Sequence, residues 1–185
     1  VHAYAKAGGN DLARLNGSAG DDTFVSDHAA GYARMITGET SSRVKFFERV
    51  EAYATTGGND VATLRGTAGD DAFVADPVSA TLTTAGMVTQ AMRFTTAAAI
   101  AGDGGTDTAE LNDSPGAEVF TATPTQASLK GKAFELVAKA FDEVHAYARA
   151  GGSDTAVLYG STGDDTYIGT ADYGKLAGVG YFVRA

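Results

Sequence analysis

The sequence predicts an all-β fold, a parallel β-solenoid (β-helix) of about four coils of roughly 47 residues, each with a hairpin. Three observations predict it. A block with the pattern Val-x-Ala-Tyr-Ala begins at Val1, Val50 and Val144, and a degenerate copy begins at Ala97. Glycine occurs 24 times against 3 prolines, and it recurs beside Asp and Asn at fixed positions, which is typical of turns. Between these turns, short segments alternate apolar and polar residues, which indicates strands.

Gly-Gly pairs set the length and boundaries of the repeat. They fall at residues 8/9, 57/58, 104/105 and 151/152, so the offsets are 49, 47 and 47 residues. We therefore interpret the chain as a single repeat array over 1–185, with units 1–49, 50–96, 97–143 and 144–185. The pattern is cut inside a unit at both ends, so we expect the chain to be a window of a longer array.

Each unit is predicted to contain strand, turn, strand, turn, strand and then a hairpin. In the second unit the predicted segments are the strand 50–54, the turn 57–60, the strand 61–64, the turn 66–71, the strand 72–74, and the hairpin strands 80–83 and 88–94. Phe47, Phe94 and Phe141 stand at equivalent positions and are expected to lead into the following unit.

Equivalent strands of successive units are expected to stack as parallel ladders. The expected ladders are Ala3, Ala52, Ala99 and Ala146 in one row, and Tyr4, Tyr53, Ile100 and Tyr147 in the next. The alternative is a set of β-propeller-like blades, because repeats of about 40 to 50 residues with four strands have this length. Small residues in the ladders favour the solenoid, whose strands lie about 4.8 Å apart.

Composition excludes several classes of function. There are 14 Lys and Arg against 23 Asp and Glu, giving a net charge of −9, and the basic residues are scattered, so we expect no nucleic-acid partner. Cysteine is absent, which excludes disulfides, zinc thiolates and a thiol nucleophile. No apolar run reaches the length of a transmembrane segment.

Acidic residues concentrate in the two turns of each unit, and they make Ca²⁺ a candidate ligand. Stacked carboxylates about 5 Å apart repel by about 1 kcal/mol per pair even in water, and Ca²⁺ binds carboxylate and carbonyl oxygens. The predicted metal ligands are Asp21, Asp22, Asp70, Asp71, Asp164, Asp165 and Glu118 in the second turn, and Asp11, Asp60, Asp107 and Asp154 in the first. The alternative is that these side chains accept hydrogen bonds from backbone N–H groups and need no metal.

The second turn and the strand after it carry a nine-residue motif, G-x-x-G-x-D-x-U-x, over residues 17–25, 66–74 and 160–168. The motif resembles the nonapeptide of hemolysin-type (RTX) calcium-binding repeats, and this resemblance implies that the sixth residue and backbone carbonyls hold Ca²⁺ between adjacent turns. The sixth residues are Asp22, Asp71 and Asp165, with Glu118 in the degenerate third unit.

The motif departs from that family at its second glycine, which is replaced by Ser18, Thr67 and Ser161, and the nonapeptides do not follow one another in tandem. In the third unit Ala117 and Glu118 replace the paired aspartates, so we expect metal binding to be weakest there. The whole unit also resembles repeats of very large bacterial cell-surface proteins, which implies an extracellular or cell-surface location.

We therefore predict a non-catalytic structural segment of an extracellular bacterial fibre, stalk or adhesin, whose partners are neighbouring repeats or other copies of the chain, head to tail. An enzyme needs a unique cleft with non-repeated polar residues, whereas here the polar residues repeat. One alternative is a glycan- or ice-binding module acting through the turns or the tyrosines. Another is a β-helical polysaccharide lyase or epimerase, for which His28 is the candidate base. His2 and His145 are expected to be exposed strand residues.

Overall fold

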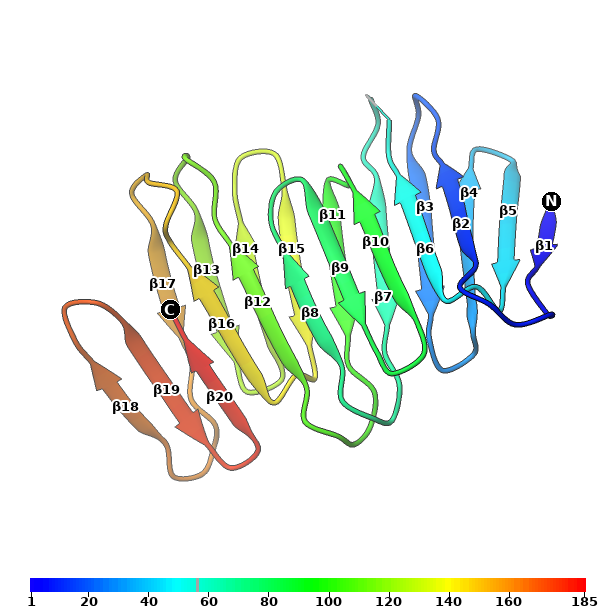
Figure 1. Ribbon diagram of the computed structural model, residues 1–185. Helices are drawn as coiled ribbons and strands as arrows, with labels where there is room; N and C mark the ends of the chain where they lie inside the picture. The colour runs from blue at the N-terminus through cyan, green and yellow to red at the C-terminus, as the bar shows by residue number, and fades with distance from the viewer. Residues whose placement is uncertain (56) are drawn as a thin grey trace.

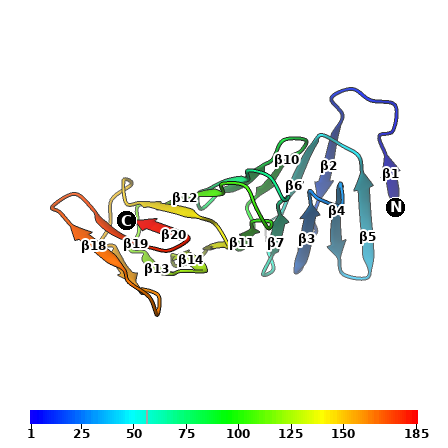
Figure 2. The ribbon, with the colours of Figure 1, turned by 90° about the horizontal axis from the view of Figure 1, so that it is seen from below.

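Two ten-stranded sheets face each other and enclose one elongated core (Figure 1). The computed structural model describes residues 1–55 and 57–185, and these residues form strands and turns without a helix. The first strand lies at one end of the molecule and the last hairpin at the other, as the view from below also shows (Figure 2). The chain is thus a β-solenoid, as predicted from the repeat, and not a ring of propeller blades.

Each repeat unit contributes five strands. Those of the first two units are β1 (His2–Tyr4), β2 (Leu12–Asn16), β3 (Asp22–Asp27), β4 (Tyr32–Thr37), β5 (Thr40–Lys45), β6 (Arg49–Tyr53), β7 (Val61–Arg65), β8 (Ala72–Ala75), β9 (Ser79–Thr83) and β10 (Val88–Met92). Those of the last two are β11 (Thr96–Ile100), β12 (Thr108–Asn112), β13 (Val119–Thr123), β14 (Gln126–Lys130), β15 (Glu135–Lys139), β16 (Glu143–Tyr147), β17 (Thr155–Leu158), β18 (Thr166–Gly169), β19 (Gly174–Gly178) and β20 (Tyr181–Arg184).

Successive units place their equivalent strands on opposite sheets. Sheet 1 has the order β1-β5-β4-β3-β7-β11-β15-β14-β13-β17, and sheet 2 has the order β18-β19-β20-β16-β12-β8-β9-β10-β6-β2. The third, fourth and fifth strands of a unit form an antiparallel meander within one sheet, whereas the chain crosses between sheets at the other three connections. Three crossings per unit is an odd number, so each unit begins on the sheet opposite to that of the previous one.

This alternation corrects the predicted ladders. Ala3 and Ala99 belong to sheet 1, whereas Ala52 and Ala146 belong to sheet 2. Ala52 pairs instead with Leu15 on β2 and Ala91 on β10. The tyrosines are separated in the same way, so the structure forms no row of equivalent residues from neighbouring units. Strand pairings between units are parallel, as expected, while the meanders make both sheets mixed.

The step from each meander into the next unit uses a residue with a left-handed backbone. Phe46, Arg93 and Ala140 have φ values of 65°, 63° and 59°, although none is a glycine. The following residue is the repeated phenylalanine, and Phe94 and Phe141 are buried in the core. Burial of an aromatic ring contributes about 1.5–3 kcal/mol and outweighs the roughly 1–2 kcal/mol of backbone strain at the preceding residue.

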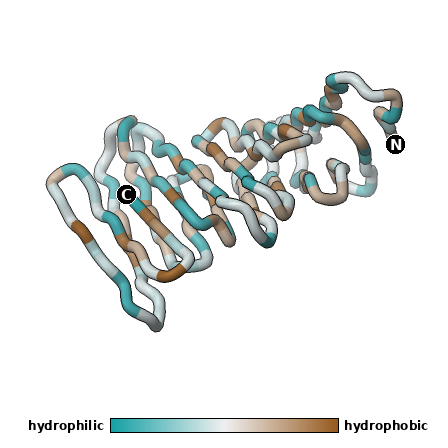
Figure 3. The backbone as a smooth tube through the Cα atoms, turned by 60° about the horizontal axis from the view of Figure 1, so that its bottom comes forward, coloured by the Kyte–Doolittle hydropathy of each residue, from teal (hydrophilic) through white to brown (hydrophobic). Residues whose placement is uncertain are grey.

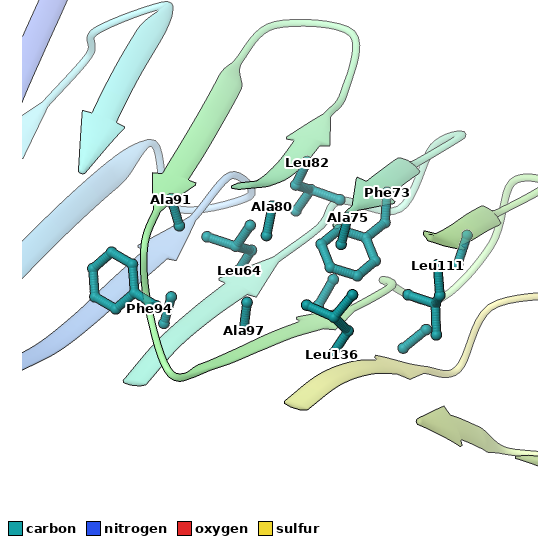
Figure 4. Packing of buried hydrophobic residues seen from close by; sticks show 14 of the residues in the cluster. Leu64, Phe73, Ala75, Ala80, Leu82, Ala91, Phe94, Ala97, Leu111 and Leu136 are labelled. Atoms are coloured by element: carbon teal, nitrogen blue, oxygen red, sulfur yellow. The ribbon is translucent and has the colours of Figure 1, made fainter. Parts of the chain in front are cut away.

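Alternating side chains of the two sheets fill the core. Leu64, Ala97 and Leu136 point from sheet 1 toward Leu82 and Leu111 of sheet 2 (Figure 4). Phe24 and Phe73 occupy the same repeat position and have no exposed surface. The intervening residues face outward, and hydrophobic and hydrophilic residues therefore succeed one another along the backbone (Figure 3). The core runs the length of the solenoid because each coil buries its apolar face against the next.

Candidate functional site: the stacked acidic turns

The predicted metal ligands lie in two stacked turns. We call residues 8–11, 57–60, 104–107 and 151–154 the glycine turns, and residues 17–22, 66–71, 113–118 and 160–165 the acidic turns. From the second unit on, each glycine turn packs on the acidic turn of the preceding unit. Asp60 accepts the backbone N–H of Asp22 at 2.9 Å, and Asp107 accepts that of Asp71 at 2.8 Å. These bonds connect one unit to the next, so the repeated aspartates have a structural role at every interior contact.

The last acidic residue of each acidic turn also closes its own turn. The Asp71 carboxylate accepts the Thr67 backbone N–H at 3.1 Å and the Thr67 hydroxyl at 3.2 Å. That hydroxyl accepts the backbone N–H of Gly69, also at 3.2 Å. The same arrangement joins Ser18 to Asp22, Ser114 to Glu118, and Ser161 to Asp165. The hydroxyl residue that replaces the second glycine of the nonapeptide is therefore part of the turn.

The first aspartate of the pair binds the next unit as well. Asp21 accepts the backbone N–H of Asn59 at 2.7 Å, and Asp70 accepts that of Thr106 at 2.8 Å. Asp164 holds the corresponding position at the C-terminal end of the array and is exposed to solvent. In the first two pairs the first aspartate thus accepts from the backbone of the following glycine turn, and the second donates its backbone N–H to the aspartate of that turn.

Burial and crowding raise the pKa of two glycine-turn aspartates. Asp107 is 2% exposed, and burial first, then the neighbouring Asp71, Asp142 and Asp70 carboxylates, raises its pKa to about 6. Its backbone N–H donates to Asp142 at 2.8 Å. Burial likewise raises the pKa of Asp60, which is also 2% exposed. Asp60 and Asp107 are thus the two aspartates of the turns whose charged form is disfavoured by their surroundings.

The outer glycine-turn aspartates, Asp11 and Asp154, are less enclosed. Asp11 is half-buried and donates its backbone N–H to Glu48 at 2.8 Å. Asp154 is exposed and accepts the backbone N–H of Glu118 at 2.9 Å.

Glycine is required where the two turns touch. A Cβ atom on Gly58 would lie 2.5 Å from the carbonyl carbon of Gly20, and one on Gly105 would lie 2.5 Å from that of Gly69. Both residues also have positive φ values, +81° and +88°. The Gly-Gly pair therefore allows the backbones to approach closely enough for the aspartate bonds to form.

The only three-carboxylate cluster found among the described residues lies between the third and fourth units. Oxygen atoms of Asp113, Glu118 and Asp154 lie within 4.8 Å of one another. Asp113 also accepts the backbone N–H of Ala150. The ligand list predicted from sequence omits Asp113, because this residue replaces the first glycine of the turn and falls outside the repeated pattern. Three carboxylates thus lie close together beside the acidic turn where the sequence predicted metal binding to be weakest.

His28, the candidate base, is buried between two threonines of the next unit. Its Nδ1 lies 3.1 Å from the Thr84 hydroxyl and its Nε2 lies 2.9 Å from the Thr89 hydroxyl. The Thr84 hydroxyl donates to the Met87 carbonyl, so it accepts from Nδ1–H, and Nε2 accepts from Thr89. Burial lowers the pKa of His28 to about 4. The ring is therefore a neutral bridge between the first two units.

An open groove of about 700 Å³ passes beside His28 and is lined in part by Lys6, Phe46 and Glu48. Both ring nitrogens of His28 already bind hydroxyl groups, so the ring offers no free nitrogen to a molecule in this groove.

The repeated tyrosines do not form a continuous surface. Tyr4 is exposed on sheet 1, whereas Tyr53 and Tyr147 lie on sheet 2 with β10, β9, β8 and β12 between their strands. Tyr53 donates to Glu51 at 2.8 Å, within a cluster that includes Arg14 and Arg49. His2 is exposed, as predicted, while His145 is partly buried against Tyr147.

No described segment is a helix of the length and apolarity needed to cross a membrane. Comparisons with models of protein families, with curated proteins and with solved structures find no match to this chain.

Proposed function

We propose that this chain is a non-catalytic structural repeat segment of an extracellular bacterial fibre, stalk or adhesin. The observation that carries the proposal is the use of the repeated polar residues: the aspartates and glycines of the turns bond one unit to the next. Repetition of a unit joined in this way lengthens the solenoid and leaves its cross-section unchanged. A segment built to extend a polymer has these properties.

The alternatives have less support from the same residues. A lyase or epimerase needs an accessible base, whereas His28 is 7% exposed and bonded through both ring nitrogens. A glycan- or ice-binding module acting through tyrosines needs an array of equivalent rings on one face, and the alternation of units places Tyr4 and Tyr53 on opposite sheets.

Immunogold electron microscopy of the bacterium that encodes the chain tests this function. Antibodies raised against the purified 185-residue chain are expected to label fibres or a surface layer outside the cell. Pre-immune serum and a strain lacking the gene are the controls. Labelling confined to the cytoplasm, or turnover of a uronic-acid polysaccharide by the purified chain, would contradict the proposal.

Calcium is the cofactor that we propose for the crowded carboxylates. Burial is the first cause of the raised pKa of Asp107, and the neighbouring Asp71, Asp142 and Asp70 carboxylates add to it; a divalent cation would relieve the repulsion among these charges. The Asp113, Glu118 and Asp154 cluster offers a second group of oxygen ligands. The hydrogen bonds of the turns already join neighbouring units, and calcium would reinforce that contact.

We expect Ca²⁺ to raise the melting temperature of the chain relative to EDTA, and to do so less in Asp107→Asn. The asparagine keeps an oxygen acceptor for the Asp71 N–H but removes the charge, so in EDTA the variant should be at least as stable as the parent. Asp103→Asn, at an exposed residue of the same loop, is the matched control and should keep the full calcium effect. Equal calcium effects in both variants, or none in the parent chain, would leave the turns as metal-free hydrogen-bonded structures. Differential scanning calorimetry measures all of these quantities.

A further inference from the structure

We propose that two sets of basic side chains on the outer faces of the sheets bind an acidic polysaccharide, one whose sugars carry carboxylate or sulfate groups. The inference rests on the proposed structural function outside the cell and gives that function a partner. Each set contains two permanent cations, a tyrosine and a histidine. The first set is His2, Tyr32, Arg34 and Arg43, and the second set is His145, Tyr173, Lys175 and Arg184.

The two sets occupy the same four positions of the repeat. The second unit has Glu51, Ser79, Thr81 and Gln90 at these positions, and the third has Ala98, Gln126, Ser128 and Val137. The four positions therefore change together, because the first and fourth units have the whole set and the other two have none of it. Residues that join the coils, such as the Gly-Gly pair and the aspartate of the glycine turn, recur in every unit instead. We infer that the sets serve a purpose other than stacking.

Strand pairing places the two cations of each set directly opposite each other. Arg34 on β4 faces Arg43 on β5, and Lys175 on β19 faces Arg184 on β20. Like charges at such positions repel each other and destabilise a sheet. Among the described residues, none of these four side chains forms an ion pair with a carboxylate. An anion bound between the two cations would turn their repulsion into attraction.

A tyrosine ring orients one guanidinium group in each set. Cζ of Arg43 lies 4.5 Å from the centre of the Tyr32 ring, and Cζ of Arg184 lies 4.4 Å from that of Tyr173. A cation–π contact of this kind uses none of the N–H donors of the guanidinium. These donors form a planar fork that suits the paired oxygens of a carboxylate or a sulfate.

A histidine from the first strand of the unit completes each set. His2 on β1 faces Arg43, and His145 on β16 faces Arg184. Both sets contain a buried nitrogen without a hydrogen-bond partner, Nε of Arg43 and Nδ1 of His145. In the part of the chain that the structure describes, the one other buried side-chain atom without a partner is Oγ of Ser26. The sets thus hold polar groups whose hydrogen-bonding capacity the chain leaves unused.

An open hollow of about 350 Å³ lies over the first set. It is lined by His2, Tyr32, Arg34, Ser41 and Arg43. A ligand in this hollow would therefore meet cations and hydroxyl groups. The outer face at these positions is open also where a unit has neighbours on both sides, since Thr81 and Gln90 of the second unit are partly exposed.

The alternation of units places the two sets on opposite sides of the molecule. The first lies on sheet 1 and the second on sheet 2, toward opposite ends of the solenoid (Figure 1). One chain would therefore hold two polysaccharide strands apart and link them. Glu143 lies 3.7 Å from His145, and Glu110 faces His145 from β12, so we expect the second set to bind an anion more weakly than the first.

The distribution of charge favours a polysaccharide over a nucleic acid. The net charge is −9, and the acidic turns follow the second strand of every unit, so a polymer with a phosphate at each nucleotide would be repelled along most of its length. Each set offers only two permanent cations. A sugar chain whose charges are more widely spaced can bind them and avoid the turns.

Isothermal titration calorimetry of the purified chain with short oligosaccharides tests the inference. The probes are a hexasaccharide of galacturonate, a sulfated hexasaccharide of chondroitin, and neutral maltohexaose. We expect two sites per chain for an acidic probe and none for the neutral one, and the tighter of the two acidic probes identifies the anion. EDTA in the buffer prevents calcium from bridging the sugar to the acidic turns.

A double variant of the first set should remove one site. Arg34→Thr with Arg43→Gln gives the first unit the residue types that Thr81 and Gln90 provide in the second, which the fold already accommodates. The tighter site should disappear, so that the stoichiometry falls from two to one.

The second set and a control are tested in the same way. Lys175→Thr with Arg184→Gln should remove the weaker site and keep the tighter one. Lys130→Gln with Lys139→Gln removes two charges from exposed residues of sheet 1 in the third unit, and this matched control should keep both sites. Circular dichroism verifies each fold, and the single substitutions replace any double variant that does not fold.

Three results would overturn the inference. One is that neither acidic probe binds. Another is that the control variant loses as much binding as the variants of the two sets, because binding would then follow the total charge. The third is that a single-stranded oligonucleotide of equal charge binds both sets more tightly, which would assign them to a nucleic acid.

The proposed structural function fails by different observations. The probe should be recovered from the titration with its length unchanged, and its turnover would contradict the function and not the sites. A chain that binds acidic sugars at both sets but is labelled only in the cytoplasm would also keep the sites and refute the function. Labelled surface fibres together with a chain that binds no acidic probe would refute only the sites.

Discussion

Asp71 connects its own turn to the next unit through both its carboxylate and its backbone N–H. Its carboxylate binds Thr67 within its own turn and the N–H of Gly102 in the next unit, while its own backbone N–H binds Asp107. Hydrogen bonds to a charged group are worth about 1.5–3 kcal/mol, so this one residue stabilises both the turn and the contact between units. Because Asp71 is only 1% exposed, the loss of any of these partners would leave a buried polar group unpaired and would destabilise the fold.

The lowered pKa of His28 predicts that the free energy of unfolding of the chain decreases in acid. Its pKa is about 4 in the folded chain and about 6.5 when unfolded, so the unfolded state binds more protons between these values. The contribution is fully present above pH 6.5 and is lost as the pH falls toward 4, by at most about 1.4 kcal/mol per pH unit. Urea titrations at several pH values should show a smaller decrease in His28→Gln, which cannot gain the proton.

Asp27 and Asp71 are the charged groups that act on the ring, and both oppose the effect of burial. The comparison between parent and variant cancels the titration of other carboxylates. If the free energies of unfolding of the two proteins fall in parallel between pH 6.5 and 4, His28 is already protonated in the folded state and the neutral bridge is wrong.

The sequence predicted which residue types form the site, but it only partly predicted what those side chains bind. A turn aspartate that accepts backbone N–H groups and one that binds calcium have the same sequence signature, so Asp71 alone did not distinguish them. Asp113 was missed because it departs from the repeat, and its partners Glu118 and Asp154 come from positions 5 and 41 residues further along the chain. For His28, burial between Thr84 and Thr89 depends on contacts with the next unit that no local pattern encodes.

At the scale of the turn, the close contact between units predicts that Gly105→Ala strongly lowers the free energy of unfolding. The added Cβ would meet the backbone of Gly69, and the positive φ would be strained as well. Gly151→Ala is the matched control, since its φ of +101° carries similar strain but nothing lies within 4 Å of the added atom. We expect Gly151→Ala to lower the free energy of unfolding by about 1–2 kcal/mol, and Gly105→Ala by several kcal/mol, in chemical denaturation. Equal losses would mean that strain alone, and not contact, keeps glycine at these positions.

The strands and turns were predictable because alternation and glycine spacing are local signals. Segments expected at 61–64, 72–74 and 80–83 correspond to β7, β8 and β9. The assignment of strands to sheets was not predictable, because a glycine-containing connection looks alike whether it reverses a strand within a sheet or crosses to the other sheet. The connection after Thr83, which contains Gly86, stays in sheet 2, whereas the one after Arg65 crosses, and such differences decided which equivalent strands share a sheet.

At the scale of the whole molecule, the solenoid followed from the repeat itself. Each unit has an apolar face that only a neighbouring unit can cover, so stability accumulates along the array through contacts between neighbours. Location, calcium and the identity of partners involve molecules outside this chain, and for these the sequence offers only resemblance.

Because each unit makes an odd number of crossings between the sheets, the structure repeats every two units, whereas the sequence repeats every unit. Any surface feature encoded once per unit appears on alternating faces of the solenoid, so two opposed rows arise from a single repeated sequence. Loss or gain of one unit by recombination would turn everything beyond the junction by half a revolution, whereas loss or gain of two would preserve its orientation. Length variants with even and odd numbers of units would therefore fall into two classes that present their last unit to opposite sides.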